Sequence, residues 1–259
     1  MPRTSLLLLA LPAALAADVA ASAAQEGRIA FQRTVKYDFE VPEAWGNRGE
    51  EIPTGDLTEL VLFFSASESL MMPVPEDRNA NAGEVNRRAA RIAERLRSFS
   101  ASRSDQETLL ESWVDLVGGA IAETREFMGR TFRITGARPE YAWKLSGEQR
   151  AFLGYTVQKA TADHDGSTIE AWFTTEIPVA AGPGPYGGLP GMILVVSVDE
   201  GHTLYAATDV ELGGLGDGGV IAAPDEGDEV SREEYERIVA EKLEEVRTLR
   251  GSGRRRPPF

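Results

Sequence analysis

The sequence contains no cysteine and only two histidines, His164 and His202. Without cysteine, the chain can form no disulfide bond, thiol nucleophile, thiolate metal ligand or cysteine-linked lipid, so packing alone must hold the fold together. No H-x-x-x-H or G-x-S-x-G pattern is present either. The sequence therefore offers no anchor for the common zinc-hydrolase or serine-nucleophile templates.

Basic residues are outnumbered by acidic ones, with 27 Lys and Arg against 41 Asp and Glu, which gives a formal net charge of −14. A chain of this charge repels the phosphate backbone instead of attracting it. We therefore expect no nucleic-acid partner.

Long hydrophobic runs are also scarce, and the one clear run lies near the start. Residues 1–24 combine an early cation, Arg3, with an apolar run from Leu6 and several small-residue triplets, which is the pattern of a secretory signal peptide. The alternative is an uncleaved anchor, but Pro12 and Asp18 interrupt the run, which falls short of the ~20 apolar residues of a membrane span. We expect an exported protein, periplasmic, outer-membrane-associated or secreted, with no transmembrane span in the mature chain.

What the sequence does contain is a series of strand patterns. Residues 29–41 alternate between apolar and polar side chains with a period of two, and residues 60–66 are continuously apolar. Six further patterns follow: "RTFRITG", "YAWKLSG", "GYTVQKATAD", "TIEAWFTTEI", "MILVVSV" and "HTLYAATDVEL". The short turns at 164–167 and 199–201 indicate antiparallel neighbours, because a parallel pair needs a crossover of a dozen or more residues.

Helical patterns appear in two places. Between about 79 and 128, Asn81 with Glu84 and Ser104 with Glu107 fit the capping-box spacing, and apolar residues recur at helical intervals, so we expect two helices. After an acidic, glycine-rich linker at 216–230, Ser231 and Glu234 repeat the capping box and open a helix over 231–250, whose apolar stripe should pack on the sheet. A basic, disordered tail is expected at 251–259.

These patterns predict a mainly β (α+β) fold: a single curved antiparallel sheet of about eight strands within residues 25–215, with inserted helices and a C-terminal amphipathic helix.

The segment "GPGPYGGLPGM" at 182–192 separates two of the predicted strands. It matches G-x-G-x-x-G literally, but a strand follows it and its prolines lack the N–H groups that a phosphate cradle uses, so we expect no nucleotide there. We expect instead a rigid loop whose apolar side chains either cap the core, the simpler interpretation, or cover the mouth of a pocket. The candidate residues for binding a ligand or partner are Trp172, Pro178, Gly182, Pro183, Tyr186, Gly187, Gly188, Leu189, Pro190 and Gly191.

Other polar groups have simpler explanations than chemistry. His164 lies between Asp163 and Asp165, which might suggest a metal site, but an Asx-Gly turn explains these residues without a metal and is the favoured interpretation. Glu170 and Glu176 are expected on one face of a strand beside Trp172, and a solvated strand face is favoured over a pair of catalytic acids. The acidic "PDEGDE" stretch lacks the register of a calcium loop. We expect no metal, no cofactor and no catalytic residue.

The stretch "AWFTTEIPVAAGPGPYGGLPGMILVV" at 171–196 closely resembles the signature of the GLPGLI family, exported proteins of Bacteroidetes-like bacteria. The segments "GRIAFQR", "FFSASESLM", "FRITG" and "WKLSGEQRAFLGYTVQKA" are similar to other parts of the family pattern, so the likeness spans 29–72 and 126–212. Val157 stands where the family commonly has cysteine, and Met192 replaces the second leucine of the naming motif. The resemblance implies an exported, mostly antiparallel β protein and brings no activity with it.

We therefore expect a non-enzymatic envelope protein that binds an apolar ligand or lipid-like group in its curved sheet. The alternative is an interaction module that works with an outer-membrane transporter or secretion system through the loop and the C-terminal helix. A hydrolase is the third class, and it would need two carboxylates within about 5–10 Å of each other in a cleft.

Overall fold

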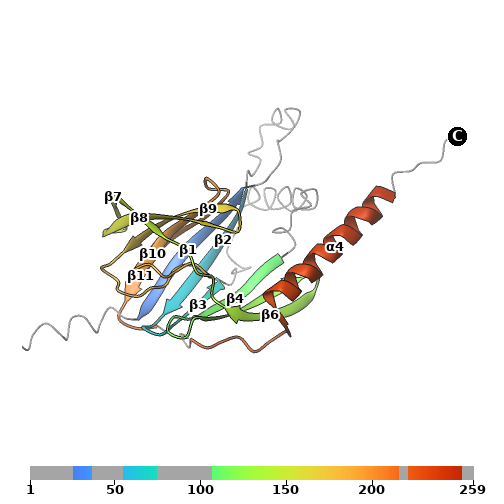
Figure 1. Cartoon of the computed structure of the whole chain (residues 1–259). Helices are drawn as coiled ribbons and strands as arrows, with labels where there is room; N and C mark the ends of the chain where they lie inside the picture. The colour runs from blue at the N-terminus through green and yellow to red at the C-terminus, as the bar shows by residue number, and fades with distance from the viewer. Residues whose placement is uncertain (1–25, 37–54, 75–106, 216–220, 253–259) are drawn as a thin grey trace, which may run out of the picture.

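The computed structural model describes residues 26–36, 55–74, 107–215 and 221–252 (Figure 1). The elements in chain order are β1 (Gly27–Lys36), β2 (Gly55–Phe64), β3 (Glu68–Pro73), β4 (Glu107–Asp115), β5 (Ala120–Phe127), β6 (Arg130–Ala137), β7 (Lys144–Phe152), β8 (Tyr155–His164), β9 (Ser167–Thr174), β10 (Met192–Val198), β11 (Thr203–Leu212), β12 (Asp228–Ser231) and α4 (Arg232–Ser252). The predicted signal peptide, the first predicted helix and most of the predicted tail lie outside the described residues.

All the described strands belong to one sheet, in the order β12-β6-β5-β4-β3-β2-β1-β11-β10-β9-β8-β7. Every neighbouring pair is antiparallel except β12 and β6, which are parallel. The predicted mainly β fold with a single sheet and a C-terminal helix is confirmed. The predicted number of about eight strands is wrong, because the sheet has 12.

The helical insertion predicted up to residue 128 is wrong from residue 107 onward, where the chain forms the β4–β5 hairpin. Ser112 and Val114 are buried on one face of β4, with exposed fractions of 1% and 2%, which is strand alternation. The Asp115 carboxylate accepts the backbone N–H groups of Val117 and Gly118 at 2.9 and 2.7 Å. This Asx turn reverses the chain at Gly118 and Gly119, inside the segment predicted as the second helix.

The sheet must curl, because β6 and β7 lie ten strand spacings apart in its order yet are joined by residues 138–143 alone. In a flat sheet, ten spacings of ~4.8 Å would separate the two strands by about 48 Å. The connection spans at most about 25 Å when fully extended. It therefore crosses the hollow of the curled sheet, which remains open at its β12 and β7 edges, and we call this hollow the concave face (Figure 1).

Helix α4 packs against the β5–β6 end of this sheet. Tyr235 and Val239 are buried against Phe127, Phe132 and Ile134, as the apolar stripe predicts. The helix begins where expected, since the Ser231 hydroxyl accepts the Glu234 N–H at 3.2 Å. It ends two residues beyond the predicted 250.

The predicted linker at 216–230 is wrong at its C-terminal end, where residues 228–231 form strand β12 beside β6. The exposed Arg130 and Asp228 side chains pair across these strands at 2.7 Å. Acidic composition alone predicted a linker, but an edge strand tolerates such residues because its outer side faces water. Within the described ranges, no helix is long and apolar enough to cross a membrane.

Candidate functional site

The proline–glycine loop occupies residues 175–191 and joins β9 to its antiparallel neighbour β10, as predicted. Its backbone is tied to both strands and to itself: Met192 N–H donates to Ile177 O at 3.0 Å, and Ile193 N–H to Ala181 O at 2.9 Å. Val179 N–H donates to Ile177 O and Ala181 N–H to Val179 O, both at 2.8 Å, which is the spacing of consecutive γ-turns. The loop therefore holds one compact shape between the strands.

The loop contributes to the core of the protein. Ile177, Ala181 and Leu189 have exposed fractions of 0–2%. Ile177 and Ala181 share the main apolar cluster with side chains of β1, β2 and β3, and Leu189 packs in a second cluster with residues of β8, β9 and β10. These contacts match the simpler interpretation of the loop, in which its apolar side chains complete the core.

Close backbone approach explains two of the loop glycines. A Cβ on Gly182 would lie 2.8 Å from the Ile193 Cβ, and a Cβ on Gly191 would lie 2.1 Å from the Thr174 carbonyl oxygen. Neither position has room for any side chain. These two glycines are therefore explained by the close packing of the loop, and a phosphate-binding role is not needed to account for them.

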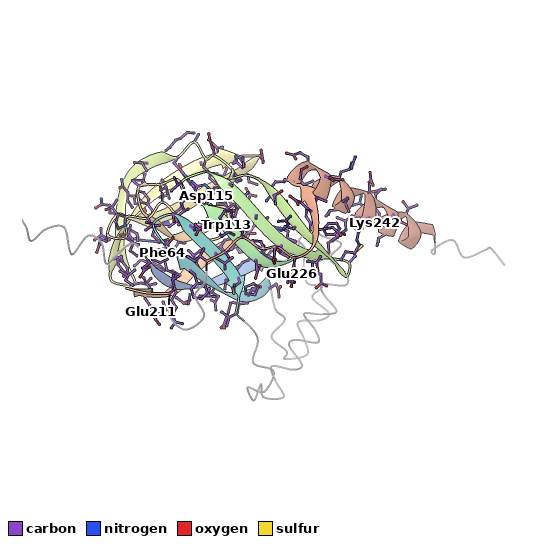
Figure 2. The ribbon with its side chains drawn as sticks, turned by 90° about the horizontal axis from the view of Figure 1, so that it is seen from below. Phe64, Trp113, Asp115, Glu211, Glu226 and Lys242 are labelled. Carbon is purple, nitrogen blue, oxygen red and sulfur yellow. The ribbon has the colours of Figure 1, made fainter. Side chains whose placement is uncertain are left out.

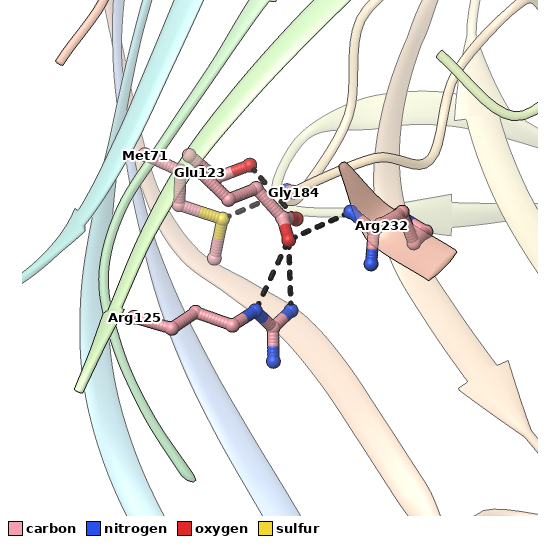
Figure 3. A network of polar contacts seen from close by, with 6 residues as sticks. Met71, Glu123, Arg125, Gly184 and Arg232 are labelled. Carbon is pink, nitrogen blue, oxygen red and sulfur yellow. Dashed lines mark hydrogen bonds and ion pairs between the residues drawn. The ribbon is translucent and has the colours of Figure 1, made fainter. Parts of the chain in front are cut away.

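The tip of the loop reaches across the concave face to the far strands. Gly184 N–H donates to the Met71 sulfur on β3 at 2.9 Å, beside the Glu123 carboxylate of β5 (Figure 3). Met71 and Glu123 are themselves on one face, because Met71 pairs with Ser112 and Ser112 with Glu123 in the register of the sheet.

Glu123 is a fully buried carboxylate at the centre of a polar network (Figure 3). One of its oxygens lies 3.1 Å from Arg125 Nη2 and 2.9 Å from Arg232 Nη2, and Ser112 Oγ lies 3.5 Å from the other. Burial by itself would raise the pKa of Glu123, but the two guanidinium groups outweigh burial and hold that pKa below its usual range. The network therefore joins an ionised carboxylate of the sheet to the first residue of α4.

A row of aromatic side chains lines the concave face next to this network. The rings of Tyr141 and Tyr186 stack with centroids 5.6 Å apart, Tyr186 meets Tyr205 edge-on at 5.9 Å, and Tyr141 lies 5.3 Å from Trp143. We call Tyr141, Trp143, Tyr186 and Tyr205 the aromatic row. Trp143 Nε1 donates to Gly187 O at 2.9 Å, which ties the row to the loop.

All four members of the aromatic row are partly exposed, although they pack against a buried cluster. Burial raises the pKa of the Tyr141 and Tyr186 phenols well above the usual value, and the charge of Glu123 acts in the same direction on both. These phenols remain neutral hydrogen-bond donors at physiological pH. The row therefore combines apolar ring faces with polar edges.

Two arginines adjoin the row. Arg33 of β1 lies over the Tyr205 ring, with its Cζ 5.9 Å from the ring centroid. Arg138, directly after β6, lies against the loop at Gly187 and Gly188. Desolvation lowers the pKa of Arg138, while Tyr141 and Glu140 act in the opposite direction.

The residues predicted to bind a ligand or partner do not lie together on one surface. Pro178, Gly188 and Pro190 are exposed, whereas Gly182, Pro183, Gly187, Leu189 and Gly191 are buried in the loop and only Tyr186 joins the aromatic row. Trp172 points away from Ala171 and Phe173 to the other face of β9, where the Arg150 Cζ lies 3.8 Å from its ring centroid.

The other polar candidates make structural contacts. Glu170 accepts Trp172 Nε1 at 2.9 Å and pairs with Lys159 at 2.7 Å. Glu176 lies beyond the end of β9, where it accepts the Thr156 N–H at 2.7 Å. His164 precedes the predicted tight turn, in which Asp165 and Gly166 have φ of 49° and 83°. Among the described residues, no three His, Asp or Glu side chains gather as metal ligands.

Sequence reasoning missed Glu123, Arg138 and most of the aromatic row. Tyr141 and Trp143 stand in the segment predicted as a strand, yet they belong to the connection that crosses the concave face. Glu123 stands in the segment predicted as a helix. The available signal was the pairing of aromatic and arginine residues in "ARPEYAW", which precedes a strand and has no strand period of its own.

The fold and the site thus define an open, curled β-sheet protein whose concave face carries a packed loop and an aromatic row. Residues 163–195 match the sequence model of a family described as "Protein of unknown function (Porph_ging)", and this segment overlaps most of the stretch that resembles the GLPGLI signature. No curated protein matches the chain.

Two solved structures of PNGF-II, in two space groups, resemble the fold with a TM-score of 0.52 and 15% sequence identity. The match covers 83% of this chain and 33% or 32% of the PNGF-II chains, so this chain spans about a third of their length. At this identity, the likeness concerns the fold alone.

Proposed function

We propose that this protein is an exported, non-enzymatic binding protein of the GLPGLI type that takes a ligand with an apolar body along the aromatic row. The observation that carries the proposal is that four aromatic side chains on the concave face remain partly exposed beside a buried cluster. Concave surfaces lined by aromatic groups and a few fixed polar groups are the usual form of small-molecule sites.

The loop supports this proposal by fixing the geometry of the row. Tyr186 belongs to the loop, and Trp143 is bonded to its Gly187 carbonyl, so both rings are held before any ligand arrives. A site that is already ordered loses less conformational entropy on binding.

The packed core limits the shape of the ligand. Ile177, Ala181 and Leu189 already occupy the interior beneath the loop, so a bulky ligand would have to displace core side chains. A slender apolar chain or a flat ring lying along Tyr141, Tyr186 and Tyr205 avoids that cost. The proposed ligand is therefore lipid-like in width.

Export to the cell envelope is part of the same proposal. It is supported by the signal-peptide pattern of residues 1–24 and by the resemblance of residues 171–196 to an exported family. A periplasmic or outer-membrane-associated protein meets lipid-like molecules routinely. No other compartment accounts for the N-terminal pattern as simply.

Native mass spectrometry of the protein purified from its own envelope tests this function. We expect an added small-molecule mass on the wild-type protein, and its loss when Tyr186 and Tyr205 are both changed to serine. Leu145→Ser is the matched control, because Leu145 is an exposed apolar residue of β7 with an exposed fraction of 56%. Wild-type protein of bare polypeptide mass, or an equal loss in the control, would count against the function.

A second function is favoured by one observation on α4. Beyond Leu243 the described side chains of the helix are mostly exposed, and Lys242 lies on the helix away from the sheet (Figure 2). This projecting segment would suit an interaction module that works with an outer-membrane transporter or secretion system. A pull-down from envelope extracts tests this second function. If one transporter or secretion component is recovered by Tyr186→Ser but not by Val246→Asp, the interaction function is supported. Equal recovery by both variants would exclude this role for the helix.

A further inference from the structure

The guanidinium of Arg138 is built into the loop. The Arg138 N–H donates to Gly119 O at 2.8 Å, which anchors the start of the connection that crosses the concave face. A Cβ on Gly187 would lie 3.3 Å from Arg138 Nη1, and a Cβ on Gly188 would lie 3.3 Å from Nη2. Side chains at those positions would crowd the guanidinium. The two glycines therefore leave room for it.

Among the described residues, no carboxylate forms an ion pair with this guanidinium, although the charge of Glu140 acts on it. In the part of the chain that the structure describes, no ion pair or hydrogen bond involves the Arg138 side chain, and desolvation already lowers its pKa. A guanidinium carries five N–H donors and no acceptor. Arg138 is partly exposed, so these donors are accessible to an anionic ligand.

Arg33, which lies beside Tyr205, also has a side-chain N–H group without a hydrogen-bond partner among the described residues. Its Nε is buried and has no hydrogen-bond partner among the described residues. The chain has 41 acidic and 27 basic residues, so acids for pairing are not in short supply. Other arginines do have such partners, as the pairs of Arg232 with Glu123 and of Arg28 with Glu211 show. Among the described residues, the concave face thus holds Arg138, whose guanidinium forms no ion pair, and Arg33, whose buried Nε has no hydrogen-bond partner.

Resting on the function proposed above, we propose that the ligand carries an anionic group, a carboxylate or a phosphate, which the Arg138 guanidinium binds beside the Gly187–Gly188 backbone. The planar fork of arginine fits both groups through paired hydrogen bonds. Arg33 adds positive potential near Tyr205, and the aromatic row takes the apolar body. The ligand class is then an acidic amphiphile.

Calorimetry with three ten-carbon probes below their aggregation limits tests the inference on the full mature chain. We expect decanoate or decyl phosphate to bind about 10- to 100-fold more tightly than decan-1-ol, as suits a charge-assisted hydrogen-bond pair. The tighter of the two anions distinguishes a carboxylate from a phosphate ligand. Arg138→Gln should abolish the preference over the alcohol, and Arg138→Lys should restore part of it.

Arg247→Gln is the control, because it removes the same charge from an exposed position on α4, where Arg247 pairs with Glu244. If Arg138→Gln alters the urea midpoint, the variant is destabilised and Arg33→Gln replaces it in the test. Arg33→Gln should still weaken the preference of the protein for the two anions over decan-1-ol. Equal binding of all three probes would overturn this inference and leave the proposed function standing. Failure of every probe, the alcohol included, would overturn both.

Discussion

Replacing Glu123 with glutamine should weaken the fold more than its single charge suggests. The carboxylate is fully buried, and its ion pairs join β5 to the start of α4. Breaking a buried pair typically costs about 3–5 kcal/mol, because the remaining charge is left poorly solvated. Here the Arg125 and Arg232 side chains keep exposed fractions of 25% and 35%. We therefore expect the lower end, about 3 kcal/mol.

The pH dependence of this loss has a definite sign. The two arginines hold the pKa of Glu123 in the folded state below its unfolded value, so the ionised carboxylate stabilises the fold at pH above about 4.3, the unfolded pKa. That contribution is lost as the pH falls through the folded pKa. The difference in stability between wild type and Glu123→Gln should thus be full at neutral pH and shrink below about pH 4.

Urea denaturation followed by circular dichroism at several pH values measures both quantities. Glu211→Gln is the matched control, since Glu211 also pairs with an arginine, Arg28, at 2.6 Å but on an exposed surface. We expect little change in that variant. Equal effects of the two substitutions, or a Glu123→Gln loss that does not change with pH, would refute the assignment of a buried, ionised link.

Three further predictions concern the loop, the helix and the aromatic row. Gly191→Ala should lower the free energy of unfolding by about 1–3 kcal/mol, because the added Cβ meets a backbone carbonyl. Gly147→Ala is the control and should leave the urea midpoint unchanged, because a Cβ at Gly147 has nothing within 4 Å. Equal midpoints for the two variants would contradict the loop packing. Tyr235→Ala should cost about 3 kcal/mol by removing a ring that is 1% exposed and 5.4 Å from Phe132, and an unchanged melting temperature would mean that α4 is not docked. Tyr141 and Tyr186 have raised folded-state pKa values, so their neutral phenols stabilise the fold below about pH 10, and this contribution is lost as the pH rises further. An ultraviolet titration measures the ionisation of the tyrosines. If all tyrosines ionise together in the folded protein, the burial of Tyr141 and Tyr186 is contradicted.

Sequence periodicity predicted the strands whose apolar and polar residues alternate regularly. It failed where the apolar residues of a strand also fit a helical spacing. Leu109, Trp113 and Leu116 fit a helical spacing, yet Leu109 and Trp113 lie in strand β4, which has a register shift after Leu109, and Leu116 lies in the turn that follows. A β-bulge offsets the alternation by one residue, which makes a strand resemble a helix in a short window. Strand β12 has only four residues and a mostly polar sequence, so period analysis has nothing to detect.

The candidate site was predictable only where its residues are adjacent in sequence. The loop stands out by its glycine and proline content, and its place between two antiparallel strands is confirmed. Tyr141 and Glu123 approach Tyr186 only because the sheet curls and residues 138–143 cross its hollow. That curl depends on the strand order, and strand order cannot be derived from the period of any one segment.

The most direct test of the central claim is an NMR titration of the tyrosine-labelled protein with decanoate. Binding along the aromatic row predicts concentration-dependent shifts of Tyr141, Tyr186 and Tyr205, with Tyr235 beneath α4 unchanged as an internal control. Shifts confined to Tyr235, or no shift of the three row tyrosines at any concentration, would contradict the claim that the concave face is the binding surface.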